Sequence, residues 1–167
     1  MSTSDARPAH APRDFLVRAA DRRAGEVSFC HPLNPLSEVH GFLLGRHTGL
    51  RRAGVSLLRV PPGKESFVHH VHHVDEEWMF VLSGRGELRI GDERFDVGPG
   101  DFAGFPPRTL PHHLRNVGGE DLVYLCGGEA LDWGVADFPD LGKRLVHLGD
   151  EVTVYPLEAG EPLLGDR

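Results

Sequence analysis

The chain has 167 residues, 40% hydrophobic and 26% charged, which suits one globular domain with a sizeable core. Its formal net charge of −7 argues against nucleic-acid binding, which needs clustered lysine and arginine. No apolar run approaches membrane-spanning length and only two cysteines are present, so a reducing, cytoplasmic compartment is expected.

The first third of the chain predicts little regular structure. Residues 1–13 are rich in proline, alanine and serine without periodicity, which predicts a mobile tail. Phe15–Arg18 is either a first strand or a short packing segment. Two prolines lie on either side of Asn34 in the stretch His31–Pro35, which predicts an irregular loop.

Short apolar segments bounded by glycine and proline follow. Gly54–Val60 predicts a strand, and the three consecutive breakers Pro61–Gly63 end it. Phe67–His73 and Trp78–Leu82 predict the next two strands. A hairpin is expected over Glu87–Val97, with a Gly-Asp pair at its tip.

Three more short strands are predicted before the chain becomes irregular: Phe102–Phe105, Leu114–Val117 and Leu122–Cys126. Short strands at a spacing of about eight to twelve residues, separated by glycine and proline turns, predict an all-β sandwich or barrel.

The C-terminal segment is less regular. Ala136–Pro139 and Leu141–Lys143 predict a loop with a turn of helix. Val152–Tyr155 alternates in polarity, which predicts a late strand packed on the main fold or on a partner chain. Gly160–Arg167 is expected to fray.

Four of the eleven histidines lie within the five residues His69–His73. Alternate residues of a strand share a face, so His70 and His72 point one way while His69 and His73 point the other. Imidazole and carboxylate groups together suit a divalent metal. The alternative is a solvated hairpin with a chance run of histidines.

Two further residues complete the predicted site. The strand period places Glu77 in the same interior as Met79, and a chain reversal before it would bring Glu77 beside the His70/His72 pair. His112 shares a strand face with Leu114 and offers a third imidazole if that face points inward. The neighbouring His113 remains the alternative ligand. The outward histidines are expected at the surface or behind the ligands; they are His69, His73 and His113.

At these residues the sequence resembles the cupin family. The first motif of that family is matched by Gly63, His70-Val71-His72, Glu77 and Gly84, and the second by Gly100, Pro106, His112 and Asn116. The gap from Gly63 to His70 is one residue longer than usual. The internal glycine of the second motif is replaced by Arg108 or Thr109 in a longer loop, and the spacing from His112 to Asn116 favours His112 over His113.

The resemblance implies a double-stranded β-helix, a small jelly-roll barrel, over residues 54–126. A tail at 1–13, an N-terminal extension at 14–53 that packs on the barrel, and a C-terminal extension at 127–167 would flank it. It also implies one divalent transition metal, such as Fe, Mn, Ni or Zn, and a homodimer. The implied metal ligands are His70, His72, Glu77 and His112.

Three imidazoles and one carboxylate leave coordination positions open for a small-molecule substrate or for O₂. This favours a metal-dependent dioxygenase, or an isomerase or lyase that works through an enolate. The alternative is a non-catalytic cupin that senses or binds a small molecule or carbohydrate. Tyr124 is a candidate proton donor, with core packing as its other interpretation. Arg59 would meet an anionic substrate only if it points inward, and a surface ion pair is the commoner case.

Overall fold

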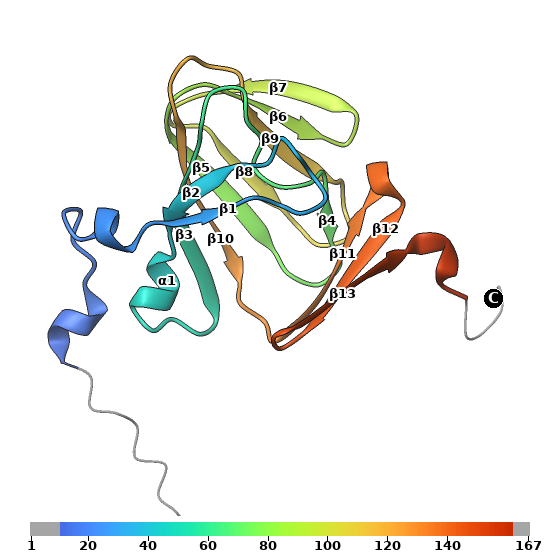
Figure 1. Cartoon of the computed structure of the whole chain (residues 1–167), viewed down its shortest axis with the longest axis horizontal. Coiled ribbons are helices and arrows are strands. Elements are labelled where there is room, and N and C mark those ends of the chain that lie inside the picture. The colour runs from blue at the N-terminus through green and yellow to red at the C-terminus, as the bar shows by residue number, and fades with distance from the viewer. Residues whose placement is uncertain (1–10, 162–167) are drawn as a thin grey trace, which may run out of the picture.

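Short antiparallel strands make up most of the computed structural model, which describes residues 11–161 (Figure 1). The strands are β1 (Val27–Phe29), β2 (Val39–Phe42), β3 (Ala53–Val60), β4 (Val71–His72), β5 (Glu77–Ser83), β6 (Gly86–Ile90), β7 (Glu93–Val97), β8 (Phe102–Phe105), β9 (His112–Asn116), β10 (Leu122–Glu129), β11 (Trp133–Phe138), β12 (Lys143–Leu148) and β13 (Glu151–Pro156). The helical turns are η1 (Pro12–Phe15), η2 (Arg22–Gly25), α1 (Leu44–His47), η3 (Pro139–Leu141) and η4 (Leu157–Ala159). The all-β prediction is therefore confirmed.

Two sheets enclose the main core. One has the order β1-β2-β3-β10-β5-β8 and the other the order β7-β6-β9. Alternate residues of both sheets are buried, as expected when each strand turns one face inward. The buried core residues come from strands of both sheets: Val39, Leu58, Val60, Met79, Val81, Leu88, Phe105, Leu114, Leu122 and Tyr124.

A third sheet joins the histidine segment to the C-terminal part of the chain. Its order is β13-β12-β11-β4, and the β12–β13 hairpin extends to the side of the barrel in orange and red (Figure 1). β11 buries Ala136 and Phe138 against Val68, with Leu145 of β12 packed beside them. This sheet therefore ties β4 to the C-terminal strands.

The predicted hairpin over Glu87–Val97 is confirmed. β6 and β7 pair from Gly86 opposite Val97 to Ile90 opposite Glu93. The turn between them places Gly91 at a φ of 58°, in the left-handed region that glycine adopts without strain. The chain thus reverses within two residues, as the Gly-Asp pair predicts.

Asn116 closes the C-terminal end of β9. Its side chain is fully buried, and its Nδ2 donates hydrogen bonds to the carbonyl oxygens of Val60 (2.7 Å) and Glu120 (2.8 Å). Its Oδ1 accepts a hydrogen bond from the Gly118 amide at 2.8 Å. A buried amide side chain needs such partners, so this motif residue ties β9 to β3 and to the following turn.

The prediction of a loop over residues 136–143 is wrong for the first three residues and for the last one. Ala136–Phe138 belongs to β11, and β12 begins at Lys143; only the turn η3 between them matches the expectation. The residues Gly134 and Ala136 have low strand propensity, but pairing with β4 and β12 and burial against Val68 override it.

Two other expectations also differ from the structure. Of the two interpretations of Phe15–Arg18, the strand is excluded: Phe15 ends η1, and no strand is assigned to the residues that follow it. The histidine strand is limited to Val71–His72, with His70 in an isolated bridge to His112. Before it, Phe67 packs against the main core and Val68 packs against Ala136 and Phe138.

Most of each predicted end segment lies outside the residues that the structure describes. The expected mobile tail lies outside the described residues except for residues 11–13, and the expected frayed end lies outside them except for residues 160 and 161. Within residues 11–161 no helix combines the length and hydropathy that crossing a membrane would require.

Candidate metal centre

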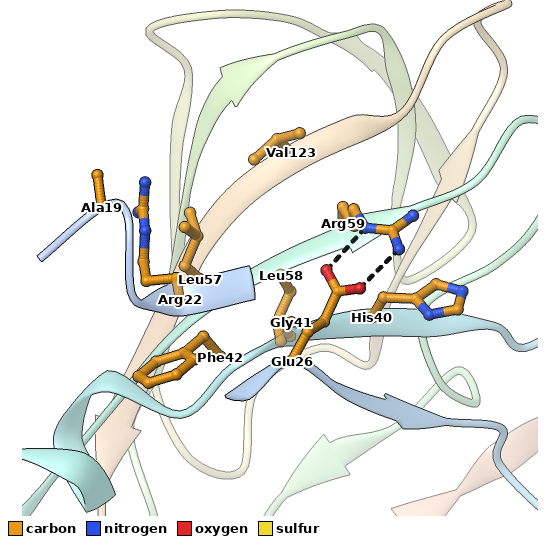
Figure 2. A pocket seen from close by; sticks show the side chains of 10 residues that line it. All are labelled: Ala19, Arg22, Glu26, His40, Gly41, Phe42, Leu57, Leu58, Arg59 and Val123. Carbon is orange, nitrogen blue, oxygen red and sulfur yellow. Dashed lines mark hydrogen bonds and ion pairs between the residues drawn. The ribbon is translucent and has the colours of Figure 1, made fainter. Parts of the chain in front are cut away.

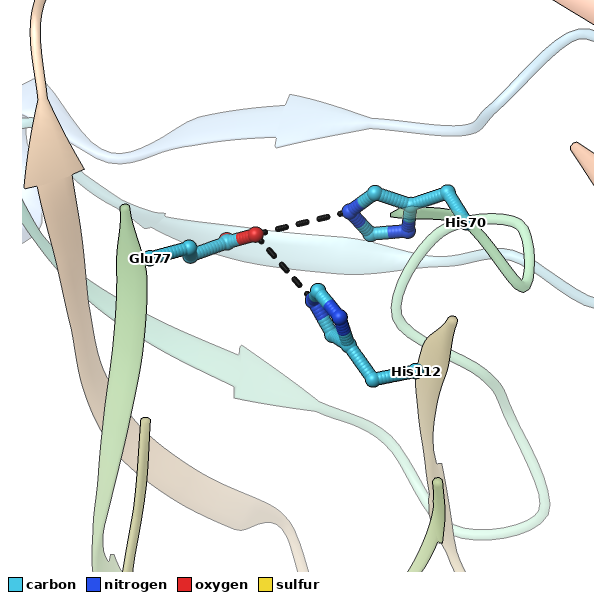
Figure 3. Close-up of side chains that lie close together, drawn as sticks. All are labelled: His70, Glu77 and His112. Atoms are coloured by element: carbon cyan, nitrogen blue, oxygen red, sulfur yellow. Dashed lines mark hydrogen bonds and ion pairs between the residues drawn. The ribbon is translucent and has the colours of Figure 1, made fainter. Parts of the chain in front are cut away.

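The carboxylate of Glu77, the first residue of β5, is the meeting point of three imidazole rings. Its Oε2 lies 3.1 Å from Nε2 of His112, 3.1 Å from Nε2 of His72 and 3.4 Å from Nε2 of His70. Figure 3 shows His70 and His112 reaching this carboxylate from two separate segments of the chain. The structure therefore brings together all four residues that the sequence proposed as metal ligands.

Backbone pairing explains how residues so far apart in sequence meet. His70 and His112 exchange two antiparallel hydrogen bonds, from His70 N to His112 O at 3.1 Å and from His112 N to His70 O at 2.8 Å. Their ring centroids lie 4.4 Å apart. His72 follows two residues later and faces the same side, as strand periodicity predicts. His113 points to the other face, where its Nε2 lies 3.3 Å from Glu65.

Other groups orient the imidazole rings. Nδ1 of His70 donates a hydrogen bond to the Val68 carbonyl at 2.7 Å, and Nδ1 of His72 lies 3.3 Å from Asp75 Oδ2. Phe105 stacks on His112, with ring centroids 3.6 Å apart and planes at 3°. Contacts of this kind fix the tautomer and orientation of metal-binding histidines.

The donor set fits a divalent metal. A carbonyl oxygen can only accept a hydrogen bond, so Nδ1 of His70 carries a proton and its Nε2 turns a lone pair toward Glu77 when the ring is neutral. Two acceptors facing each other are unfavourable, and a cation between them satisfies both. His70, Glu77 and His112 each offer a ligand atom within 4.8 Å of the others, so this cluster could hold a metal ion. His72 approaches Glu77 but its ring lies 6.4 Å from that of His112.

The electrostatics of the cluster keep Glu77 ionised. Burial acts to raise the pKa of Glu77, but its interactions with the protonated forms of His112, His70 and His72 outweigh burial and hold that pKa well below its usual range. Burial lowers the pKa of His112 to about 4, although Glu77 opposes this effect. An anionic carboxylate beside a neutral imidazole is the protonation state that metal binding requires.

A loop crosses behind the histidine segment and supports it. Arg108 occupies one of the two positions where the second cupin motif has its internal glycine, and it adopts a φ of 59°. This left-handed conformation is unfavourable for a residue with a Cβ atom. The Arg108 amide donates to the His72 carbonyl at 2.8 Å, and Nε donates to the His73 carbonyl at 3.1 Å. The sequence departs from the motif here, and Arg108 adopts a backbone conformation that favours glycine.

The outward histidines occupy three different environments. Nε2 of His73 lies 2.8 Å from Asp137 Oδ2, and His113 approaches Glu65. His69 was expected at the surface or behind the ligands, and it is not at the surface: only 6% of it is exposed. The turn η3 folds over it and places Asp140 3.3 Å from its Nδ1, which strand parity alone could not reveal.

A small cavity of about 30 Å³ adjoins the cluster. Its walls include the apolar side chains of Met79 and Leu114. Tyr124, a candidate proton donor from the sequence, and Cys126, which the sequence did not indicate as a site residue, also line it. Tyr124 is 3% exposed and its hydroxyl has no hydrogen-bond partner among the described residues. Burial, with Cys126 and Glu77 nearby, raises the pKa of Tyr124 well above its usual range.

Three supporting residues were not identified from the sequence: Val68, Asp75 and Phe105. Asp75 follows His72 by three residues, and this spacing was the one available indication. The role of the Val68 carbonyl depends on backbone geometry, and that of Phe105 depends on the approach of β8 to β9. Neither leaves a pattern in the sequence.

Arg59 does not reach the metal cluster. It forms ion pairs with Glu26 at 2.9 Å and with Asp121 at 3.1 Å, on the outer face of β3. It borders a groove of about 180 Å³ between the N-terminal segment and the sheet (Figure 2). The salt-bridged alternative for this residue is therefore correct.

Comparisons with known proteins agree with this geometry. A family model described as a cupin domain matches residues 56–128. The structure of a candidate sugar phosphate isomerase from Acidithiobacillus ferrooxidans superposes with a TM-score of 0.85 at 35% identity, covering 92% of this chain and 99% of that one.

Two curated proteins are also similar in sequence. Polyketide synthase CurC of Streptomyces cyaneus is 31% identical over 115 residues, which cover 65% of this chain and 70% of that protein. An uncharacterised protein of Methanocaldococcus jannaschii is 39% identical over 67 residues, which cover 40% of this chain and about half, 52%, of that protein's length. Together with the antiparallel sheets, these matches establish the double-stranded β-helix fold. The chain belongs to the cupin superfamily.

Proposed function

We propose that this protein is a metal-dependent isomerase that acts on a small hydroxylated carbonyl compound of the sugar phosphate class. The observation that carries the proposal is the meeting of three imidazole Nε2 atoms and one carboxylate oxygen beside a small cavity. Similarity to the candidate sugar phosphate isomerase of Acidithiobacillus ferrooxidans favours isomerisation over the other reactions that such a site supports.

Four residues would hold the metal in this proposal: His70, His72, Glu77 and His112. The donors are nitrogen and oxygen atoms without a thiolate, which suits Fe, Mn, Ni or Zn. A divalent metal bound there would act as a Lewis acid on the carbonyl oxygen of the substrate.

The other cavity residues would position protons and exclude water. Isomerisation of a hydroxy carbonyl compound moves one proton between adjacent carbons and one between their oxygens, without net oxidation. Tyr124 stays protonated because its pKa is raised, so its hydroxyl can donate a hydrogen bond to a substrate oxygen. Burial raises the pKa of Cys126 to about 12, so its thiol also stays protonated. Met79 and Leu114 would keep water from the reacting atoms.

The size of the cavity limits what enters it. A volume of about 30 Å³ has room for only a few atoms. The reacting end of the substrate would therefore lie at the cluster while the rest of the molecule remains near the mouth. A compact carbonyl end fits this restriction better than a ring system.

Oxygen chemistry and non-catalytic binding are the competing functions. The ligand set alone also permits a dioxygenase, but the similarity to the Acidithiobacillus ferrooxidans protein supports isomerisation instead. A homodimer that takes a small-molecule substrate remains part of the proposal, and size-exclusion chromatography with light scattering would test the dimer.

The test is turnover by metal-loaded protein on aldose and ketose phosphates, with 1,3-diketones and catechols as comparison compounds. Isomerisation is followed in D₂O by NMR as solvent deuterium enters the carbon next to the carbonyl, while an electrode monitors O₂. We expect interconversion without O₂ uptake, and a loss of at least about a hundredfold in His70→Ala and Glu77→Gln. His73→Gln, from the outward face of the same segment, is the matched control.

The outcomes separate the three functions. Consumption of O₂ with conversion of a diketone or catechol would replace the isomerase with a dioxygenase. A compound that raises the melting temperature but is never converted would indicate a binding protein. Full activity in His70→Ala would contradict the proposed site.

A further inference from the structure

A second pocket lies on the opposite face of the strand that carries His112. It has a volume of about 280 Å³ and opens on the outer face of the β7-β6-β9 sheet, beneath the turn η3. His69 and His113 line it, and each is the immediate neighbour of a proposed metal ligand. The pocket and the metal cluster thus share strands but face opposite sides.

The charged groups of this pocket balance one another. Three guanidinium groups and three carboxylates line it: Arg89, Arg94, Arg115, Glu65, Glu87 and Asp140. Arg89 forms a bidentate pair with Asp140, and Arg94 pairs with Glu87. Arg115 forms no ion pair with any residue between 11 and 161. Because the carboxylates equal the guanidinium groups in number, the pocket carries no excess positive charge from them and does not favour a strongly anionic ligand.

His69 lacks the hydrogen bonds that a buried imidazole needs. It is 6% exposed, and neither ring nitrogen makes a well-aligned hydrogen bond within the described range, although the Asp140 carboxylate and the backbone of Pro111 lie beside the ring. Nδ1 lies 3.3 Å from Asp140 Oδ2, but the two are not aligned for a hydrogen bond. Buried polar atoms without partners are rare in folded proteins, so this ring is available to a ligand in the pocket.

Apolar side chains form the remaining wall. Leu33, Val68 and Leu141 lie beside the charged groups, and Leu141 is 40% exposed at the rim. A ligand that fits must therefore offer C–H surface on one side and hydrogen-bonding groups on the other. The ligand must also fit a pocket whose volume is slightly below the range of about 300–1,000 Å³ that is typical of pockets for drug-sized molecules.

We infer that this pocket binds a small uncharged polyhydroxylated ligand of the monosaccharide class. A hydroxyl group accepts a hydrogen bond from a guanidinium and donates one to a carboxylate, so neighbouring hydroxyls can bridge Arg89 or Arg94 to Asp140 or Glu87. Hydroxyls also satisfy either nitrogen of His69, and the C–H face of a sugar ring packs on the leucines. This site is separate from the metal cluster and does not depend on the proposed isomerase activity.

The experiment is isothermal titration calorimetry of metal-loaded protein with methyl glycosides of common hexoses and pentoses. A methyl glycoside cannot open to a carbonyl form, so an isomerase cannot convert it. We expect at least one glycoside to bind. Its affinity should fall at least about tenfold in Asp140→Asn and in Glu87→Gln, because each change removes a charged acceptor. Asp96→Asn removes an exposed partner of Arg85 on the same sheet and is the matched control.

Three results would overturn the inference. Binding of inorganic phosphate that is lost in Arg89→Ala, without binding of any glycoside, would show an anion site. Glycoside binding that survives both pocket variants but disappears in His70→Ala would belong to the metal cavity. No glycoside binding with a Kd below about 10 mM would mean that water alone satisfies His69.

Discussion

Replacement of Tyr124 by phenylalanine tests two interpretations of the most deeply buried polar group beside the metal cluster. The Tyr124 side chain is 3% exposed, and its hydroxyl has no partner among the residues described. A buried hydroxyl without a hydrogen bond costs about 1–3 kcal/mol, and the ring of phenylalanine fills the same space. We therefore expect Tyr124→Phe to raise the free energy of unfolding by about 1 kcal/mol.

This gain is measurable in a chain of this length. A change of 1 kcal/mol shifts the melting temperature by about 2–4 °C in proteins of about 150–250 residues. Thermal unfolding of metal-free protein measures the shift without interference from metal binding. If the Tyr124 hydroxyl also donates a hydrogen bond to substrate, kcat should fall about a hundredfold in the same variant. A substitution that raises the stability of the protein but lowers its activity is typical of a functional residue rather than a packing residue.

The other tyrosine of the chain provides the control. Tyr155 lies on β13, is partly exposed and does not line the cavity, so Tyr155→Phe should leave kcat unchanged. Its hydroxyl interacts with Arg144, so this variant should not gain stability. A lower melting temperature in Tyr124→Phe would show that the hydroxyl is hydrogen-bonded in solution. An unchanged kcat would reduce Tyr124 to core packing.

Three further predictions follow from separate features. Chelation should lower the melting temperature of the native protein, since metal at 100 times its Kd stabilises the folded state by about 2.7 kcal/mol. The melting temperature of His70→Ala should be the same with and without chelator, and elemental analysis should find little metal in this variant. Arg108→Gly should keep stability within about 0.5 kcal/mol, because relief of the left-handed backbone offsets the lost bond to His73, whereas Arg108→Ala should lose about 1 kcal/mol in denaturant titrations. A hydrogen bond from Arg144 lowers the pKa of Asp137 in the folded protein. The stability that the ionised Asp137 contributes is therefore complete above the unfolded pKa of about 3.9 and is lost as pH falls through the lower folded pKa. In Asp137→Asn, the free energy of unfolding should differ less between about pH 6 and about pH 3 than it does in the native protein.

Local patterns in the sequence predicted much of the fold and, together with the resemblance to cupins, the four proposed ligands. The period of two along a strand separates His70 from His69, and it separates His112 from His113, because neighbouring side chains must point to opposite faces. Glycine and proline positions fixed the turns around β6, β7 and β8, because few other residues adopt those conformations.

Only the tertiary structure decided how these segments meet. β11 contains small residues with low strand propensity, and it forms because β4 and β12 pair with it on either side. The left-handed conformation of Arg108 and the burial of His69 beneath η3 likewise depend on distant segments. Parity assigns a side chain to a face, but the depth of that face below the surface is set by what packs over it. The orientation of Tyr124 toward the cavity, and the pocket around His69, therefore could not be read from the sequence.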